Sequence, residues 1–335
     1  MKHCLAIVAL CLGTCWPGQA AVMVERQRDL GVMGTRLRII ALGEDAAALD
    51  QAIDAAVAEI RRVEDLMTDW RPSPLTQLNA QAGQPVTVPR ELAAIISRAV
   101  ALHNLTGGAF DPTFAAVGAL WDFKAQPPQI PDKAAIHAAL KRVGGDRVIV
   151  DGANNQVHLP TGMSVGLGGI AKGYGVDRAM AVLQTHGVRH ALVDAGGDMK
   201  LLGTRHGKPW EVAVKHPRDR EHALAVLHLS NSCIVTSGDY ERFVEHAGTR
   251  YHHILDPRTG YPATGAMSAT VVAYSAELAD AVATALCVLG PVEGLKLVER
   301  QKRVEAVIVG MDGRVHVSTG LKSEVARAAA RGYRP

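Results

Sequence analysis

The chain has 335 residues, of which 48% are hydrophobic, 21% charged and 4% aromatic. These values are typical of a globular protein that is long enough for one large domain or two coupled lobes. The formal net charge is only +3, and Lys and Arg are spread along the chain. A nucleic-acid-binding protein usually concentrates its basic residues, so the charge pattern argues against a nucleic-acid partner.

The first twenty residues have the pattern of a secretory signal. Lys2 and His3 precede an apolar run over residues 4–12, and Gly18 and Ala20 place small residues at the two positions that a leader peptidase reads. The run is too short to span a bilayer. We therefore predict a signal peptide over residues 1–20, a mature domain over residues 21–335 and a periplasmic location.

Cleavage after Ala20 would remove three of the five cysteines and leave Cys233 and Cys287. Two distant cysteines do not make a disulfide framework, even in an oxidising compartment. Both lie in apolar segments, so we expect them to pack in the core. A lipid anchor on Cys15 is less favoured than cleavage, because the usual small residue is missing just before that cysteine.

In the first half, residues 37–41 predict a strand. Apolar residues at every third or fourth position over residues 49–67 predict a long amphipathic helix. A second helix is expected over residues 91–105, ending at a pair of glycines. A short helix over residues 133–143 follows a proline-rich loop.

In the second half, a glycine-rich segment over residues 166–169 is expected to open a helix that runs to about residue 186. Short strands are then expected at residues 191–193, 199–202, 211–214, 223–227, 233–236, 269–272, 304–309 and 315–317, with helices over 276–289 and after Pro291. Strands and helices mix here without regular βαβ alternation. This pattern favours an α+β fold over a doubly wound sheet.

The glycine-rich segment, residues 164–174, has the composition of a pyrophosphate cradle. Glycines let the backbone approach a ligand, N–H groups at a helix start favour an anion, and Lys172 adds positive charge. The P-loop pattern fails because Ala171 stands where its second glycine belongs. The dinucleotide fingerprint G-x-G-x-x-A matches from Gly166, but only three residues are left for its strand. The alternative is a glycine turn that closes a helix against a sheet.

Asp280 and Thr284 are four residues apart on an otherwise apolar helix, so both oxygens face the same side. A carboxylate and a hydroxyl are hard oxygen ligands that suit Mg²⁺, which needs few protein ligands when it binds phosphates. The alternative is a helix-capping Asp with a Thr bonded back to its own helix.

His252 and His253 are adjacent on a predicted strand that runs into an Asp-Pro-x-Thr-Gly turn. Strand alternation sends the two rings to opposite faces, so one of them can enter a cleft and take a proton from a hydroxyl. The alternative is a structural histidine pair. Further polar, glycine-bearing turns at residues 108–113, 196–198 and 236–240 accompany this segment.

Taken in order, these segments resemble one family, ApbE, the FAD:protein FMN transferases. The segments that carry the resemblance are Met33-Gly34-Thr35, residues 108–113 (Gly-Ala-Phe-Asp-Pro-Thr), 168–174 (Gly-Gly-Ile-Ala-Lys-Gly-Tyr), 236–240 (Thr-Ser-Gly-Asp-Tyr), 253–260 (His-Ile-Leu-Asp-Pro-Arg-Thr-Gly) and 280–284 (Asp-Ala-Val-Ala-Thr). They extend from about residue 33 to residue 290, which is most of the predicted mature chain.

The resemblance implies a two-lobed α+β fold with FAD bound between the lobes. It also implies Mg²⁺ on the FAD pyrophosphate and transfer of FMN to a Ser or Thr hydroxyl of an acceptor flavoprotein, with release of AMP. Asp280, Thr284 and the backbone carbonyl of Gly169 match the metal ligands of the family. His253 matches its proposed catalytic base.

The flavin-contacting positions carried over from the family are Met33, Trp70, Ala109, Phe110, Asp111, Gly166, Lys172 and Ile254. Trp70 replaces a frequent Tyr, which suggests a ring stacked on the isoalloxazine. This chain departs from the family at Gly166, where an Asp is usual. A second departure is the stretch after Trp70, residues 71–75, which lacks the usual acidic residue.

Three rival functions stay open from the sequence. The same site could pass FMN to water as an FAD pyrophosphatase, or the protein could be a non-catalytic periplasmic flavin carrier. A nicotinamide dehydrogenase rests on the glycine fingerprint alone. By analogy with the family, the acceptor is expected to be a periplasmic or membrane-tethered subunit of an electron-transfer system.

Overall fold

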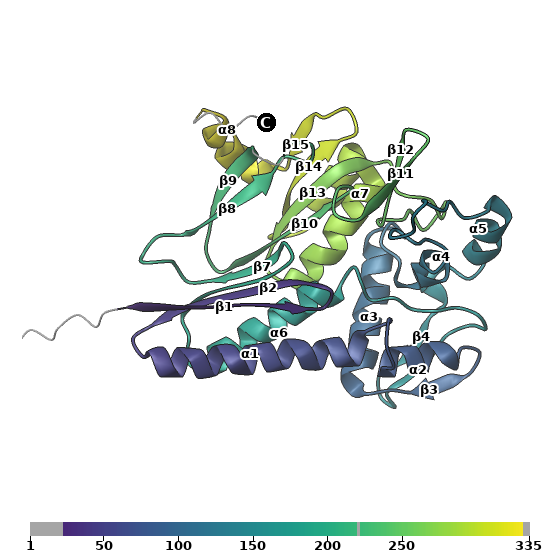
Figure 1. Ribbon diagram of the computed structural model, residues 1–335, viewed down its shortest axis with the longest axis horizontal. Helices are drawn as coiled ribbons and strands as arrows, with labels where there is room; N and C mark the ends of the chain where they lie inside the picture. Colours follow the sequence, from purple (N-terminus) through teal and green to yellow (C-terminus); the bar gives the residue numbers. More distant parts are fainter. Residues whose placement is uncertain (1–22, 220–221, 331–335) are drawn as a thin grey trace, which may run out of the picture.

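An eight-stranded antiparallel sheet forms the centre of the molecule (Figure 1). The computed structural model describes residues 23–219 and 222–330, so the predicted signal peptide lies outside the described residues. The strands follow the order β1-β2-β6-β7-β10-β13-β14-β15. Their bounds are β1 (Val24–Val32), β2 (Thr35–Gly43), β6 (His190–Ala195), β7 (Asp198–Leu202), β10 (Ser232–Gly238), β13 (Ala266–Ala273), β14 (Glu305–Gly310) and β15 (Val315–Val317).

Three long helices cover one face of this sheet: α1 (Ala46–Met67), α6 (Ala171–Thr185) and α7 (Ala276–Glu299). Their apolar side chains and those of the sheet form the largest buried cluster. By length and composition, α7 could also cross a membrane. Its packing against β10, β13 and β14 accounts for that composition, since a helix buried in a core is apolar on most sides.

The opposite face of the sheet is covered by a hairpin, β8 (Trp210–Lys215) and β9 (Ala223–Leu229), and by α8 (Lys322–Ala330). The alternation of apolar residues along β8 places Trp210, Val212 and Val214 on its buried side. The central sheet is therefore covered on both faces.

The remaining elements gather at one end of the sheet, at the right of Figure 1. They are α2 (Pro74–Ala80), β3 (Pro85–Thr87), α3 (Arg90–Leu105), η1 (Pro112–Phe114), α4 (Ala115–Gly118), α5 (Lys133–Leu140), η2 (Gly145–Arg147), β4 (Ile149–Asp151), β5 (Gln156–His158) and the hairpin β11 (Phe243–His246) and β12 (Thr249–His252). The cluster under α1, α6 and α7 continues into α3 and the small sheet β3-β5-β4.

The predicted α+β fold is confirmed, because all strand pairings in the described residues are antiparallel. The predicted helices and strands are present with shifted ends. The two helices predicted around Pro291 are both present and together form α7, with a non-helical kink between them at Gly290, whose φ is 73°. Cys233 and Cys287 are unpaired and fully buried, as predicted.

Several elements were not expected from the sequence: β1, α2, the small sheet and β11, whereas the strand predicted at the two histidines is β12, which ends at His252. Five of the nine residues of β1 are polar or charged, so β1 has little apolar alternation. It lies at the edge of the sheet, where one side stays open to solvent.

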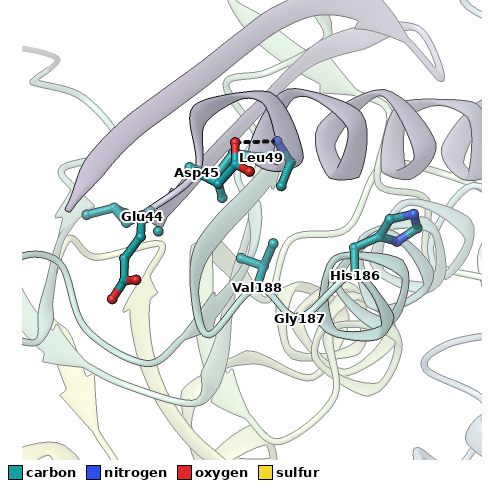
Figure 2. A pocket seen from close by; sticks show the side chains of 9 residues that line it. Glu44, Asp45, Leu49, His186, Gly187 and Val188 are labelled. Atoms are coloured by element: carbon teal, nitrogen blue, oxygen red, sulfur yellow. Dashed lines mark hydrogen bonds between the residues drawn. The ribbon is translucent and has the colours of Figure 1, made fainter. Parts of the chain in front are cut away.

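A small hollow of about 130 Å³ lies between the start of α1 and the end of α6 (Figure 2). The Asp45 carboxylate beside it caps α1 by accepting hydrogen bonds from the N–H groups of Ala47 and Ala48, at 2.8 and 3.1 Å. The His186 ring lies with Nδ1 2.9 Å from the Val182 carbonyl oxygen. None of the predicted site residues lines this hollow.

Candidate active site

The glycine-rich segment forms a loop that leads into α6. No strand runs directly into it, since β5 ends at His158, and α6 begins at Ala171, so the expectation that Gly166–Gly169 opens the helix is wrong by a few residues. The missing strand and the antiparallel sheet also rule out a dinucleotide-binding fold, since that fingerprint works only between a parallel strand and its helix. Gly168 is exposed, with open space where a side chain would be.

Asp280 lies in the second turn of α7 and is only 2% exposed. The helix is capped by Ser275, whose hydroxyl accepts from the Leu278 N–H, so Asp280 is not a capping residue. Its carboxylate accepts hydrogen bonds from the Gly173 N–H, at 3.2 Å, and from the Lys172 ammonium, at 3.4 Å. The carboxylate therefore faces the first turn of α6.

Thr284 lies one turn further along α7, beside the glycine loop. Among the described residues its hydroxyl makes no hydrogen bond, so it is not bonded back to its own helix. A Cβ added at Gly169 would lie 3.4 Å from Thr284 Oγ1 and 3.2 Å from the Phe110 ring. The fold thus brings together the three predicted metal ligands, Gly169, Asp280 and Thr284.

The donors at this point are a carboxylate, a hydroxyl and a backbone carbonyl, a set that fits Mg²⁺ bound together with phosphate oxygens. Within the described ranges, no three His, Cys, Asp or Glu side chains gather into a group that could hold a metal ion. A transition-metal site of His and Cys ligands is therefore not formed by these residues.

Lys172 lies between two buried carboxylates, and only one of them was predicted. Its ammonium is 2.7 Å from Asp198 and 3.4 Å from Asp280. Burial opposes the charge on Lys172, but the two carboxylates outweigh it and raise the pKa of the lysine. Burial and the nearby Asp280 carboxylate raise the pKa of Asp198. The only sequence signal for Asp198 was its position after two glycines.

His253 directly follows β12 and is half-buried. Its N–H donates to the Arg242 carbonyl oxygen at 3.0 Å, and its ring Nδ1 lies 3.3 Å from the same oxygen. A carbonyl cannot donate, so this contact favours the proton on Nδ1 and leaves the Nε2 lone pair free. Burial, followed by the neighbouring His252 and with a smaller contribution from Lys172, lowers the pKa of His253 to about 4.

The His252 ring has a different environment from the His253 ring. The sequence predicted that the two rings point to different sides. His252 is buried, and its Nε2 lies 2.8 Å from the Ala263 carbonyl oxygen. The separation does not come from strand alternation, because β12 ends at His252. His252 is the structural member of the pair.

Two predicted flavin-contacting residues, Met33 and Trp70, lie just after the ends of β1 and α1. Met33 lies in the β1–β2 turn with φ of 52°, and its N–H donates to a Glu64 carboxylate oxygen at 2.9 Å. The Arg242 guanidinium donates to the Gly34 carbonyl oxygen at 3.3 Å, which ties this turn to the segment that holds His253. Trp70 follows α1 and is 61% exposed, so its ring is available to stack on a ligand.

Ala109, Phe110 and Ile254 are buried. Asp111 is also buried, and its carboxylate accepts from the Thr113 N–H and hydroxyl, at 2.7 and 2.6 Å, and from the Gly145 N–H, at 3.1 Å. Its side chain therefore shapes the segment after α3, and any flavin contact at this position falls to the backbone.

The structure also explains how the chain accommodates glycine at position 166. The Gly166 N–H donates to the Pro112 carbonyl oxygen at 2.7 Å, and a Cβ would lie 3.1 Å from the Ala115 Cβ and 3.4 Å from the Phe114 ring. A side chain here would press against α4 and η1, so this chain has no room for the usual carboxylate without a shift of those elements.

Comparisons with known proteins agree with this arrangement. The model of the ApbE family matches residues 33–308. A curated FAD:protein FMN transferase of Treponema pallidum is 35% identical, over 97% of this chain and 95% of that protein. One of Vibrio cholerae is 32% identical, over 80% of this chain and 81% of that protein.

Solved structures are similar over the same region. The crystal structure of the ApbE protein from Thermotoga maritima superimposes with a TM-score of 0.83 at 34% identity, covering 90% of this chain and 99% of that one. The flavin transferase ApbE from Vibrio cholerae gives a TM-score of 0.79 at 29% identity, covering 90% of this chain and all of that one. With the family model matching most of its length, this chain belongs to the ApbE family.

Proposed function

We propose that this protein is an FAD:protein FMN transferase, which moves the FMN half of FAD to a Ser or Thr hydroxyl of an acceptor flavoprotein and releases AMP. One observation carries the proposal: Asp280, Thr284 and Gly169 meet beside Lys172, at the start of α6. The curated relatives that match most of the chain have this activity.

FAD would bind between the sheet with its helices and the elements at its end, as the family resemblance implies. The pyrophosphate would lie at the glycine loop, near Lys172 and the start of α6. The flavin would extend toward Met33 and Trp70, with Phe110 and Ile254 in the buried wall. Asp111 and Gly166 support this wall through their own packing.

Asp280, Thr284 and the Gly169 carbonyl would hold Mg²⁺. When bound, Mg²⁺ neutralises charge on the two phosphates and makes AMP a better leaving group. The residues of the chain supply further positive charge and hold the oxygen ligands in position. Lys172 adds a fixed positive charge, and α7 holds the Asp280 carboxylate in place at 2% exposure.

His253 is proposed as the general base. Its lowered pKa keeps the ring neutral at pH 7, and the Arg242 carbonyl orients it with Nε2 as the proton acceptor. In the proposed step the acceptor oxygen bonds to the FMN phosphorus, its proton passes to Nε2, and the bond from that phosphorus to the AMP oxygen breaks.

The proposed acceptor is a flavoprotein subunit of an electron-transfer system, and the proposed location is the periplasm, reached through the predicted signal peptide. Both proposals rest on the family resemblance and on the sequence pattern of residues 1–20. Mass spectrometry of candidate acceptors, after incubation with the protein, FAD and Mg²⁺, would identify the modified subunit.

The activity test incubates the mature protein with FAD and Mg²⁺, with and without an acceptor domain. Transfer predicts a flavin-fluorescent acceptor band and an equal amount of AMP, both lost when a chelator is added. Free FMN with no labelled acceptor would instead identify an FAD pyrophosphatase. FAD that stays intact and bound would identify a flavin carrier. Asp280→Asn is the inactive control.

A further inference from the structure

We infer that Asp198 is a positioning residue that draws the Lys172 ammonium away from Asp280, so that the Asp280 carboxylate stays available to a divalent cation. The inference rests on the proposed magnesium site. It concerns a residue outside the segments that carry the family resemblance.

Asp198 is held in place by its backbone. It follows Gly196 and Gly197, which make the β6–β7 turn with φ of 66° and 97°. As the first residue of β7 it pairs with Ala195 on one side and Val235 on the other. Its side chain is 2% exposed, so it has little freedom to move and no access to bulk water.

The distances show how Lys172 divides its contacts. Its ammonium lies 2.7 Å from the Asp198 carboxylate, the length of a charge-assisted hydrogen bond, but 3.4 Å from both oxygens of Asp280. Contacts at 3.4 Å are at the weak end of hydrogen bonding. Asp198 is therefore the main partner of the lysine.

The unequal contacts of Lys172 affect how strongly a cation can bind to Asp280. A cation on Asp280 must compete with the ammonium for the same carboxylate and is repelled by it at short range. With Asp198 charged, the ammonium has an anion of its own and the group of three keeps one net negative charge. Without that charge, Lys172 would pair with Asp280 and the group would lose its net negative charge, which weakens cation binding.

The same two elements carry a second ion pair that serves as a matched control. The Lys200 ammonium of β7 pairs with the Asp177 carboxylate of α6. Lys200 lies two residues after Asp198, so both side chains leave the strand on its helix-facing side, whereas Met199 packs in the cluster on the opposite face. Lys200 contacts neither Lys172 nor Asp280 in any described hydrogen bond or ion pair.

The test measures Mn²⁺ binding by electron paramagnetic resonance, without FAD, in the mature protein and its variants. We expect Asp198→Asn to bind Mn²⁺ about tenfold more weakly or worse, because the lysine then occupies Asp280. The double variant Asp198→Asn/Lys172→Met should regain the original affinity, since its net charge is again that of the unmodified site. Lys200→Met should bind as the unmodified protein does.

The outcomes separate this inference from the proposed function. If the unmodified protein binds no Mn²⁺, the proposed metal site itself is wrong. If it binds and Asp198→Asn binds equally well, or if Lys172→Met fails to restore the double variant, Asp198 has no positioning role. Circular dichroism checks folding. If Asp198→Asn does not fold, the single variant Lys172→Met tests the inference instead. The inference requires that Lys172→Met binds Mn²⁺ at least as tightly as the unmodified protein, and weaker binding would overturn it.

Discussion

The backbone N–H of Gly173 donates a hydrogen bond of 3.2 Å to the buried carboxylate of Asp280. This contact joins α6 and α7 at the point where the proposed metal ligands meet. A Cβ added at Gly173 would lie 2.2 Å from the Ala276 carbonyl oxygen, far inside normal contact distance. Glycine is therefore required for the close approach of the two helices, and the geometry of the site depends on it.

We expect Gly173→Ala to destabilise the protein by about 1–3 kcal/mol or more, because the backbone of α7 must shift to make room. The shift would also move Asp280 and Thr284 of α7 away from Gly169 and so lower Mn²⁺ affinity. Thermal and chemical unfolding measure the first effect. Gly152→Ala is the control, since nothing lies within 4 Å of a Cβ there and its φ is not positive. Equal stability of the two variants would contradict the packing argument.

Asp280→Asn should lower FMN transfer by about 10²–10³-fold, the usual loss when a charged group that stabilises a transition state is removed. The fold should survive, because asparagine keeps the shape and can still accept from Gly173. Initial rates at a series of Mg²⁺ concentrations measure the effect. Thr284→Ser should retain most activity and Thr284→Ala should not. Full transfer by Asp280→Asn would refute its role as a metal ligand.

The pH profile of transfer should report the lowered pKa of His253. The ring must be neutral to accept a proton, and burial lowers its pKa from the ordinary 6.5 to about 4. Transfer should therefore stay level as the pH falls from 7 to 5 and decline only near pH 4. A loss of activity with a midpoint at pH 6.5 would show that the pKa of His253 is not lowered. His253→Ala should lower kcat by about 10²–10⁴-fold and remove the decline of transfer near pH 4.

The same pKa makes a stability prediction with a definite sign. Between pH 6.5 and 4 the unfolded chain binds a proton at His253 that the folded chain does not, so stability falls as the pH drops through this window. His253→Asn should lose this part of the dependence. Urea unfolding at pH 7 and pH 5 for both proteins measures the difference, and an identical loss in both would show that other groups cause it.

Trp70 should bind the flavin by stacking. With 61% of its surface exposed, the ring has little structural role, and removing it should weaken FAD binding by about 0.5–1.5 kcal/mol, or roughly 2–10-fold. Trp70→Phe should keep most of the affinity, and Trp70→Ala should lose it. Tyr274→Ala removes another exposed ring and serves as the control. Flavin fluorescence titration measures the binding; unchanged affinity in Trp70→Ala would exclude stacking.

The sequence by itself determined the elements with strong periodicity and the segments with distinctive chemistry. The helix pattern around Ile53 and the spacing of Asp280 and Thr284 are local properties, and local periodicity decides which side chains share a face. The edge strand β1 and the short strands β3, β4 and β5 carry little periodic signal, so they emerged only in the fold.

Tertiary structure alone decided which distant residues meet. The pairing of Lys172 with Asp198 joins residues 26 positions apart and depends on the registry of β7 against α6, which no local pattern encodes. The tautomer of His253 and the use of the Asp111 carboxylate inside the protein are likewise set by neighbours from other segments. Charge, hydrogen bonding and burial depend on which residues are neighbours in space, whereas periodicity is a property of consecutive residues in the sequence.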